Sequence, residues 1–125
     1  MLMLPNQIVE AWELKEGPVI VTTVDSSGMP NSVYATCVRM SSDHRIVIAD
    51  NYFSKTRQNI EKGSLITVLF ITQAGESYQV KGEVEYHAKG VIYEFMKSWN
   101  PTKHPGHAAV VVNPLEAYSG KSKLL

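Results

Sequence analysis

Closely spaced turns between short β-rich runs constrain the fold of this 125-residue chain more than any other feature. The runs are rich in Val, Ile, Thr and Tyr, as strands are, and turn-forming residues follow each of them. A parallel crossover needs a dozen or more residues, so most of these strands must be antiparallel neighbours. The pattern therefore predicts a mainly β protein built as a small antiparallel barrel. The six predicted strands are Val19–Val24, Ser32–Met40, Arg45–Ala49, Leu65–Ile71, Ser77–His87 and Ala108–Val112.

Three short helices complete the predicted secondary structure. The first, Asn6–Glu16, has an apolar face and is followed by a Gly-Pro pair. The second begins at Ser54, a residue type favoured at the N-cap, and runs to about Lys62 before a glycine. The third, Val91–Trp99, has apolar residues at helical spacing. Residues 1–125 are expected to form a single domain, because the length suits one.

Charge and composition exclude several classes of protein. Twelve basic and twelve acidic residues give zero formal net charge, which argues against a nucleic-acid-binding protein that works by bulk electrostatics. The single cysteine, Cys37, cannot form an internal disulfide. The sequence shows no secretory-signal pattern and no apolar run long enough to span a bilayer. We therefore expect a cytoplasmic protein without nucleic-acid or membrane partners.

Lys55, Thr56 and Arg57 follow the third predicted strand, at the start of a helix. The helix dipole makes this end electropositive, so it is an unfavourable place for two cations alone. Cations, a hydroxyl and free backbone N–H groups together suit a bound anion. We interpret the segment as a phosphate site, with the phosphate part of a nucleotide-like cofactor. The alternative is that Lys55 and Arg57 are solvated side chains on a surface helix, and the segment alone leaves both interpretations open.

The order of these features resembles a known family. A Gly-Met-Pro turn, two strands, Asn51-Tyr-Phe-Ser-Lys55, a helix, an apolar strand and Val80-Lys-Gly-Glu-Val84 occur in sequence. This arrangement is similar to the FMN-binding split barrels related to pyridoxamine 5′-phosphate oxidase, and to small one-domain FMN-binding proteins. The resemblance covers roughly residues 8 to 113, nearly a whole domain, and Asn51–Lys55 is its most specific part. It implies a six-stranded antiparallel split β-barrel of the FMN-binding type.

The resemblance implies FMN in a groove between the two subunits of a homodimer. The residues from Ser54 to Arg57 would hold the phosphate, in agreement with the electrostatic argument, and the isoalloxazine ring would lie along residues 35 to 38. Asn59 lies one turn beyond Lys55 on the same helix face. Trp99 would close over the ring from the second subunit, although it suits the core face of its helix equally well. The implied cofactor-binding residues are Ala35, Thr36, Cys37, Val38, Ala49, Asp50, Ser54, Lys55, Thr56, Arg57, Asn59 and Trp99.

Two departures from the oxidase concern its substrate site and one phosphate contact. The oxidase has a longer C-terminal region that supplies basic and aromatic residues to the substrate site, whereas Glu116–Leu125 contains no arginine. Tyr34 stands where the oxidase has an arginine. The resemblance therefore implies the cofactor of the oxidase without its vitamin-phosphate substrate.

Three classes of function follow. The first is a flavin-dependent oxidoreductase acting on a small or nicotinamide-like substrate, and the second is a non-enzymatic FMN-binding electron-transfer protein. The third, a structural or anion-binding module, ignores the family pattern. A haem in the same barrel would need an axial ligand such as histidine, and the sequence places none in the groove. His104 and His107 are expected in a metal-free surface loop, and Cys37 as a small core hydrophobe.

Overall fold

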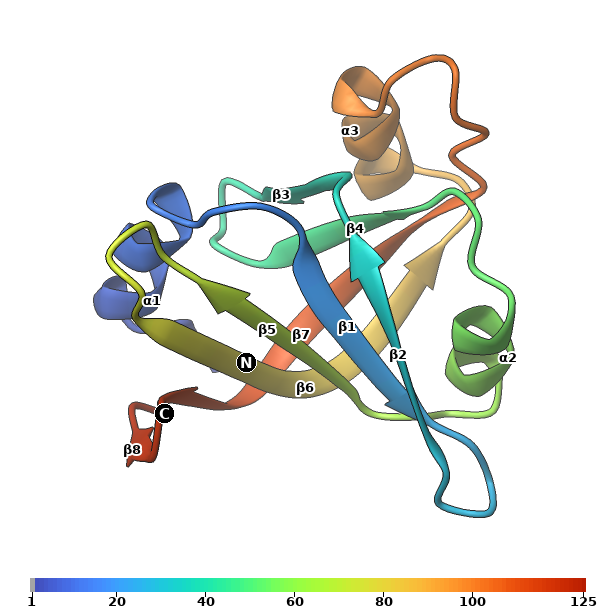
Figure 1. The fold of residues 1–125 in the computed structure, drawn as a ribbon. Coiled ribbons are helices and arrows are strands. Elements are labelled where there is room, and N and C mark those ends of the chain that lie inside the picture. Colours follow the sequence, from blue (N-terminus) through green and yellow to red (C-terminus); the bar gives the residue numbers. More distant parts are fainter. Residues whose placement is uncertain (1) are drawn as a thin grey trace.

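The computed structural model describes residues 2–125, which form short helices around one sheet (Figure 1). None of the helices in this part of the chain is long and apolar enough to cross a membrane. The helices are α1 (Asn6–Glu13), α2 (Lys55–Glu61) and α3 (Val91–Trp99). The strands are β1 (Val19–Val24), β2 (Pro30–Ala35), β3 (Val38–Met40), β4 (Ile46–Asp50), β5 (Ile66–Ile71), β6 (Ser77–His87), β7 (Ala108–Ser119) and β8 (Ser122–Lys123).

All strands belong to one antiparallel sheet in the order β2-β1-β5-β6-β7-β4-β3, with β8 paired to β7. β2 and β3 are the two ends of this order, yet they are consecutive in the chain. The sheet curls around its core, which brings these two ends toward each other (Figure 1). This is the mainly β split barrel that the sequence predicts. Residues 2–125 contribute eight strands to it, whereas six were predicted.

A β-bulge at Leu115 of β7 lies opposite Lys81 and Gly82 of β6. The register of β6 against β7 shifts between Lys81 and Gly82. A Cβ atom on Gly82 would lie 2.2 Å from the carbonyl oxygen of Asn113, so only glycine fits against β7 here. β5 pairs with β6 up to Gly82, whereas β7 follows β6 to His87. β6 is curved (Figure 1), and beyond Gly82 its residues pair with β7 and no longer with β5.

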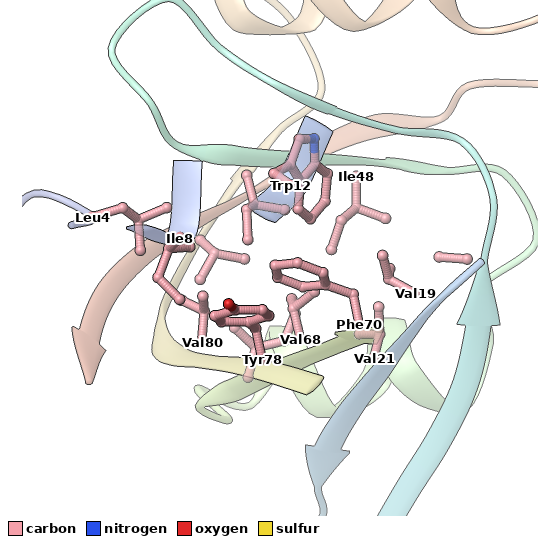
Figure 2. Packing of buried hydrophobic residues seen from close by; sticks show 14 of the residues in the cluster. Leu4, Ile8, Trp12, Val19, Val21, Ile48, Val68, Phe70, Tyr78 and Val80 are labelled. Atoms are coloured by element: carbon pink, nitrogen blue, oxygen red, sulfur yellow. The ribbon is translucent and has the colours of Figure 1, made fainter. Parts of the chain in front are cut away.

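The larger core lies between α1 and the inner faces of the strands (Figure 2). Trp12 packs edge-on against Phe70, with ring centroids 5.2 Å apart, and Phe70 stacks on Tyr78 at 5.6 Å. A backbone hydrogen bond holds the chain after α1 against the end of β5: the N–H of Glu16 donates to the carbonyl of Ile71 at 2.8 Å. The apolar face of α1 is thus used for packing.

A smaller core forms between α3 and the opposite face of β4 and β7. Ile46 and Ile48 of β4 belong to the larger core, whereas Val47 and Ala49 join Met96 of α3 in the smaller one. All five residues of β4 are buried as a result. The C-terminal end of β4 is therefore fixed between two packed layers, and the segment that follows starts from a rigid position.

The segment predicted as one strand, Ser32–Met40, is two strands. β2 pairs with β1 and β3 pairs with β4, so the chain crosses between the two ends of the sheet at Thr36–Cys37. The carbonyl of Cys37 accepts a hydrogen bond from the N–H of Ala49 at 2.9 Å across this corner. The single-strand prediction was wrong because the polarity pattern continues through the corner.

The C-terminal region contains more strand than predicted. β7 does not end at Val112 but continues to Ser119, and β8 pairs with its end. Pro114 looks like a strand breaker, yet it lies opposite Gly82 at the bulge. A proline is tolerated at such an irregularity, because the ladder needs no N–H there.

α1 is shorter than predicted. It ends at Glu13 instead of Glu16. The next residues bond to the end of β5 and its turn: Lys15 forms a bridge with Thr72, and the N–H of Gln73 donates to the carbonyl of Leu14. Contacts with the sheet thus replace the last helical turn.

Replacing Gly82 with alanine should lower the free energy of unfolding by about 1–3 kcal/mol, the usual cost of overpacking. The added methyl must displace the backbone of β7 at Asn113. Urea denaturation of Gly82→Ala measures the loss, with Glu83→Ala, at an exposed position of the same strand, as the control. A stability equal to that of the unchanged protein would contradict the tight packing of β6 on β7.

Candidate functional site

A groove of about 330 Å³ lies where the end of β2 and the corner after it approach the segment that follows β4. The loop between α3 and β7 adds one residue, His104. Three stretches far apart in the sequence therefore meet at one site. The lining residues are Asn31, Val33, Tyr34, Ala35, Thr36, Cys37, Ala49, Asn51, Tyr52, Phe53, Ser54, Lys55, Thr56 and His104.

Asp50, the last residue of β4, is fully buried directly behind this groove. Its carboxylate accepts two hydrogen bonds from Arg57, from Nε at 2.7 Å and Nη2 at 3.0 Å. It also accepts one from the hydroxyl of Tyr86 at 2.6 Å and one from the N–H of Phe53 at 3.1 Å. A buried carboxylate needs such partners, because its desolvation is otherwise very costly.

The donors around Asp50 keep their protons over the physiological pH range. Partial burial and the hydrogen bond to Asp50 raise the pKa of Tyr86 to about 12. The hydrogen bonds to Asp50 also raise the pKa of the Arg57 guanidinium above its ordinary value. Both groups therefore remain donors to the carboxylate at neutral pH.

Asn51 fastens the loop that follows α3 to the site. Its side-chain amide exchanges two hydrogen bonds with that of Asn100, at 3.0 and 2.9 Å, and both residues are buried. Its amide oxygen also accepts the N–H of Gly106 at 2.9 Å. These contacts bring His104, which lies between Asn100 and Gly106 in the chain, to the groove.

Tyr52 and His104 form a pair at the edge of the groove. The Tyr52 hydroxyl lies 3.0 Å from Nδ1 of His104, and the two rings meet edge to face with centroids 5.4 Å apart. The Tyr52 side chain is otherwise highly exposed, as is that of Tyr34 on the same groove. Two large exposed aromatic residues therefore flank the opening.

The polar end of the groove is formed by Ser54, Lys55 and Thr56. Ser54 occupies the N-cap position of α2 as predicted, but its hydroxyl makes no capping hydrogen bond. Thr56 is buried, and its hydroxyl accepts a hydrogen bond from the side chain of Asn31 at 3.1 Å. Lys55 is half exposed and its Nζ lies 3.7 Å from a carboxylate oxygen of Asp25. One ammonium group and two hydroxyls thus face the same space.

Asp25 remains charged under ordinary conditions. Hydrogen bonds from the Ser27 hydroxyl and the Met29 N–H lower its pKa to about 2. Lys55 therefore has a nearby anion in this structure, and the contact is long and exposed enough to be weak. An anionic ligand in the groove would compete with this contact for the Lys55 ammonium.

The structure brings most of the predicted site residues to the groove and places others behind or beside it. Seven line it: Ala35, Thr36, Cys37, Ala49, Ser54, Lys55 and Thr56. Asp50 and Arg57 bind one another behind it, and Asn59 is buried and donates to the Thr23 hydroxyl at 3.0 Å. Val38 packs against the larger core and Trp99 against the smaller one. The cofactor contacts of all twelve remain predictions.

Seven further residues line the groove that were not among the predicted site residues: Asn31, Val33, Tyr34, Asn51, Tyr52, Phe53 and His104. Asn51, Tyr52 and Phe53 belong to the most specific motif of the resemblance, and that signal could have included them. Asn31 and Val33 precede the residues proposed for the ring, along the same strand. His104 had no comparable signal, because its loop is held at the groove by long-range contacts such as the hydrogen bonds of Asn51 and Tyr52.

No group of three or more His, Cys, Asp or Glu side chains within residues 2–125 is arranged to hold a metal ion. The groove is instead lined by both apolar and polar residues: Val33, Ala35 and Ala49 are among the apolar ones, and Ser54, Lys55 and Thr56 among the polar ones. Such a surface can bind a ligand that has a flat apolar part and an anionic part.

Comparison with known proteins agrees with this description. The family model for pyridoxamine 5′-phosphate oxidase matches residues 4–119. HupZ of Group A Streptococcus has a TM-score of 0.80 at 23% identity, with 97% of each chain covered. An FMN-binding protein of Syntrophomonas wolfei has a TM-score of 0.70 at 19% identity, covering 95% of this chain and 92% of that one. HutZ, a haem storage protein of Vibrio cholerae, has a TM-score of 0.65 at 13% identity, covering 94% and 95%.

The similarity to these three structures is one of fold, given the low identities. The family match is broader, because its model spans nearly the whole chain and includes every residue that lines the groove. The chain therefore belongs to the pyridoxamine 5′-phosphate oxidase family.

Proposed function

We propose that this chain is a homodimeric flavoprotein that binds FMN in the groove. The observation that carries the proposal is the grouping of Ser54, Lys55 and Thr56 at one end of the groove, next to an apolar wall. Membership of the family supports it, and one structural neighbour, from Syntrophomonas wolfei, is an FMN-binding protein.

The donor set suits a phosphate ester. Charge-assisted hydrogen bonds from Lys55 would carry most of the affinity, and the hydroxyl of Ser54, which caps nothing, is available as a further donor. The backbone N–H groups of the first turn of α2 have no partner inside the helix. α2 has only seven residues, so we assign the larger share to the side chains rather than to the helix dipole.

The wall beside the phosphate end suits a flavin ring. Val33, Ala35 and Ala49 supply apolar surface, and the corner at Thr36–Cys37 supplies backbone polar groups. The flavin, when bound, would carry the electrons. The protein would bind it, orient it and exclude water from one of its faces.

The second subunit of the proposed dimer would cover the open side of the groove. Tyr34 and Tyr52 are 74% and 70% exposed beside the opening, although they are large aromatic residues. Residues of this kind are typical of protein interfaces.

Sedimentation in the presence of FMN should show a dimer, because a single chain encloses only one side of the groove. Tyr34→Glu and Tyr52→Glu would each place a charge at the proposed interface and shift the sedimentation coefficient toward that of a monomer. Leu14→Glu, at an exposed position after α1 that does not line the groove, is the control. A monomer that holds FMN tightly would contradict the dimer.

Replacing Lys55 with alanine should weaken FMN binding by about 1.5–3 kcal/mol, the usual contribution of a hydrogen bond to a charged group. Riboflavin, which lacks the phosphate, should lose little affinity, and fluorescence titration measures both ligands. Lys62→Ala is the matched control, because Lys62 is exposed at the opposite end of α2. Unchanged FMN affinity in Lys55→Ala would count against the phosphate site.

The flavin-loaded protein would be either an oxidoreductase for a small or nicotinamide-like substrate or an electron carrier. Rapid anaerobic mixing with NADH or NADPH distinguishes the two functions. Loss of the oxidised flavin absorbance within seconds would support a reductase. A flavin that bleaches only with an artificial reductant would support a carrier.

A second candidate ligand is haem, because one observation favours it. His104 lines the groove, contrary to the expectation that no histidine could be placed there. If Nδ1 donates its proton to Tyr52, 3.0 Å away, Nε2 is the nitrogen available to iron. The neighbour HutZ is a haem storage protein.

Titration with haemin tests this candidate. A Soret band that sharpens on binding in the unchanged protein and is lost in His104→Ala would support an axial role for His104. His107→Ala, an exposed histidine in the same loop, is the control. Equal haemin spectra for the unchanged protein and His104→Ala would exclude His104 as the ligand.

A further inference from the structure

We propose that Asp50, Arg57 and Tyr86 are positioning residues that set the affinity of the groove for a phosphate-bearing ligand without touching that ligand. The proposal rests on the proposed function. It also gives Asp50 and Arg57 a role different from the direct contacts that the family resemblance implies, since neither lines the groove.

The carboxylate of Asp50 is saturated by the protein itself. Oδ1 accepts from Arg57 Nη2 and from the Phe53 N–H, and Oδ2 accepts from Arg57 Nε and the Tyr86 hydroxyl. The bidentate contact occupies two guanidinium nitrogens of Arg57. The positive charge of Arg57 is thus largely neutralised by Asp50. Lys55, in contrast, is a cation that lines the groove.

Asp50 and Arg57, which form the ion pair, flank in the chain the segment that lines the polar part of the groove. Between Asp50 and Arg57 lie residues 51–56, and every one of them lines the groove. The two ends of this segment are joined by the bidentate contact, and its middle is joined to the same carboxylate through the Phe53 N–H. One buried group therefore determines where the donors Ser54, Lys55 and Thr56 stand.

Tyr86 connects this segment to the sheet. It lies in β6, 36 residues from Asp50, and its hydroxyl bonds Oδ2 of that residue at 2.6 Å. A buried ion pair contributes little net stability compared with apolar packing, so fixing a geometry is a better account of its presence than stability alone. A loop held in its binding conformation avoids the ordering cost on ligand binding.

Tyr86→Phe tests the proposal, because it removes one hydrogen bond and changes no groove residue. We expect FMN affinity to fall about tenfold, and riboflavin affinity to change less than about twofold. Tyr118→Phe is the matched control: this tyrosine also donates its hydroxyl to a carboxylate, that of Glu116, on β7. Equal losses for both ligands, or no loss in Tyr86→Phe, would overturn the proposal in favour of a merely structural contact.

Hydrogen exchange without ligand separates this proposal from the proposed function. In Tyr86→Phe the amides of residues 51–56 should exchange at least about tenfold faster, while those of β1 and β5 keep their rates. If the unchanged protein bound no flavin but showed this difference, the proposed function would fail and the positioning role would stand. Unchanged exchange of residues 51–56 would overturn the positioning role.

Arg57→Lys provides a second variant if Tyr86→Phe folds poorly. Lysine keeps the positive charge but cannot form the two parallel hydrogen bonds of the guanidinium. The same selective loss of FMN over riboflavin is expected. A loss in Arg57→Gln that Arg57→Lys fully restores would show that charge, not position, matters, and would overturn the proposal.

Discussion

The burial of one carboxylate governs the arrangement of the functional region. Asp50 has no exposed surface, and a charge in that position is tolerated only if hydrogen-bond donors surround it. The chain meets this requirement with donors from the following loop, from α2 and from β6. Meeting it also fixes the path of the chain along the groove. The hydrogen bonds that the buried Asp50 carboxylate requires therefore also determine the shape of the candidate site.

Much of the fold could be predicted from the sequence, because strand periodicity and turn residues are local signals. A small antiparallel barrel with short helices follows from them, and the resemblance to a known family adds that the barrel is split. The corner at Thr36–Cys37 could not be predicted, since it depends on which strands accept β2 and β3 as neighbours. The extension of β7 past Pro114 depends equally on Gly82 of β6, which lies opposite the proline where the register shifts.

The candidate site was predictable to a similar degree. Ser54, Lys55 and Thr56 could be proposed from charge at a helix start, and the structure brings them to the groove. Arg57 has the same local signal, yet its partner is Asp50, seven residues earlier. No local pattern distinguishes a cation that faces a ligand from one that faces a buried carboxylate. His104 depends on the amide contact between Asn51 and Asn100, whose partners are 49 residues apart.

Gly82 couples two properties that are usually considered separately. The part of β6 beyond it leaves β5, stays with β7 and carries Tyr86 to the Asp50 carboxylate. An evolutionary or engineered change that straightened this strand would move the tyrosine away from its acceptor. The same glycine therefore affects both the shape of the barrel and the position of Tyr86. Attempts to stabilise this scaffold are best directed at other parts of the sheet.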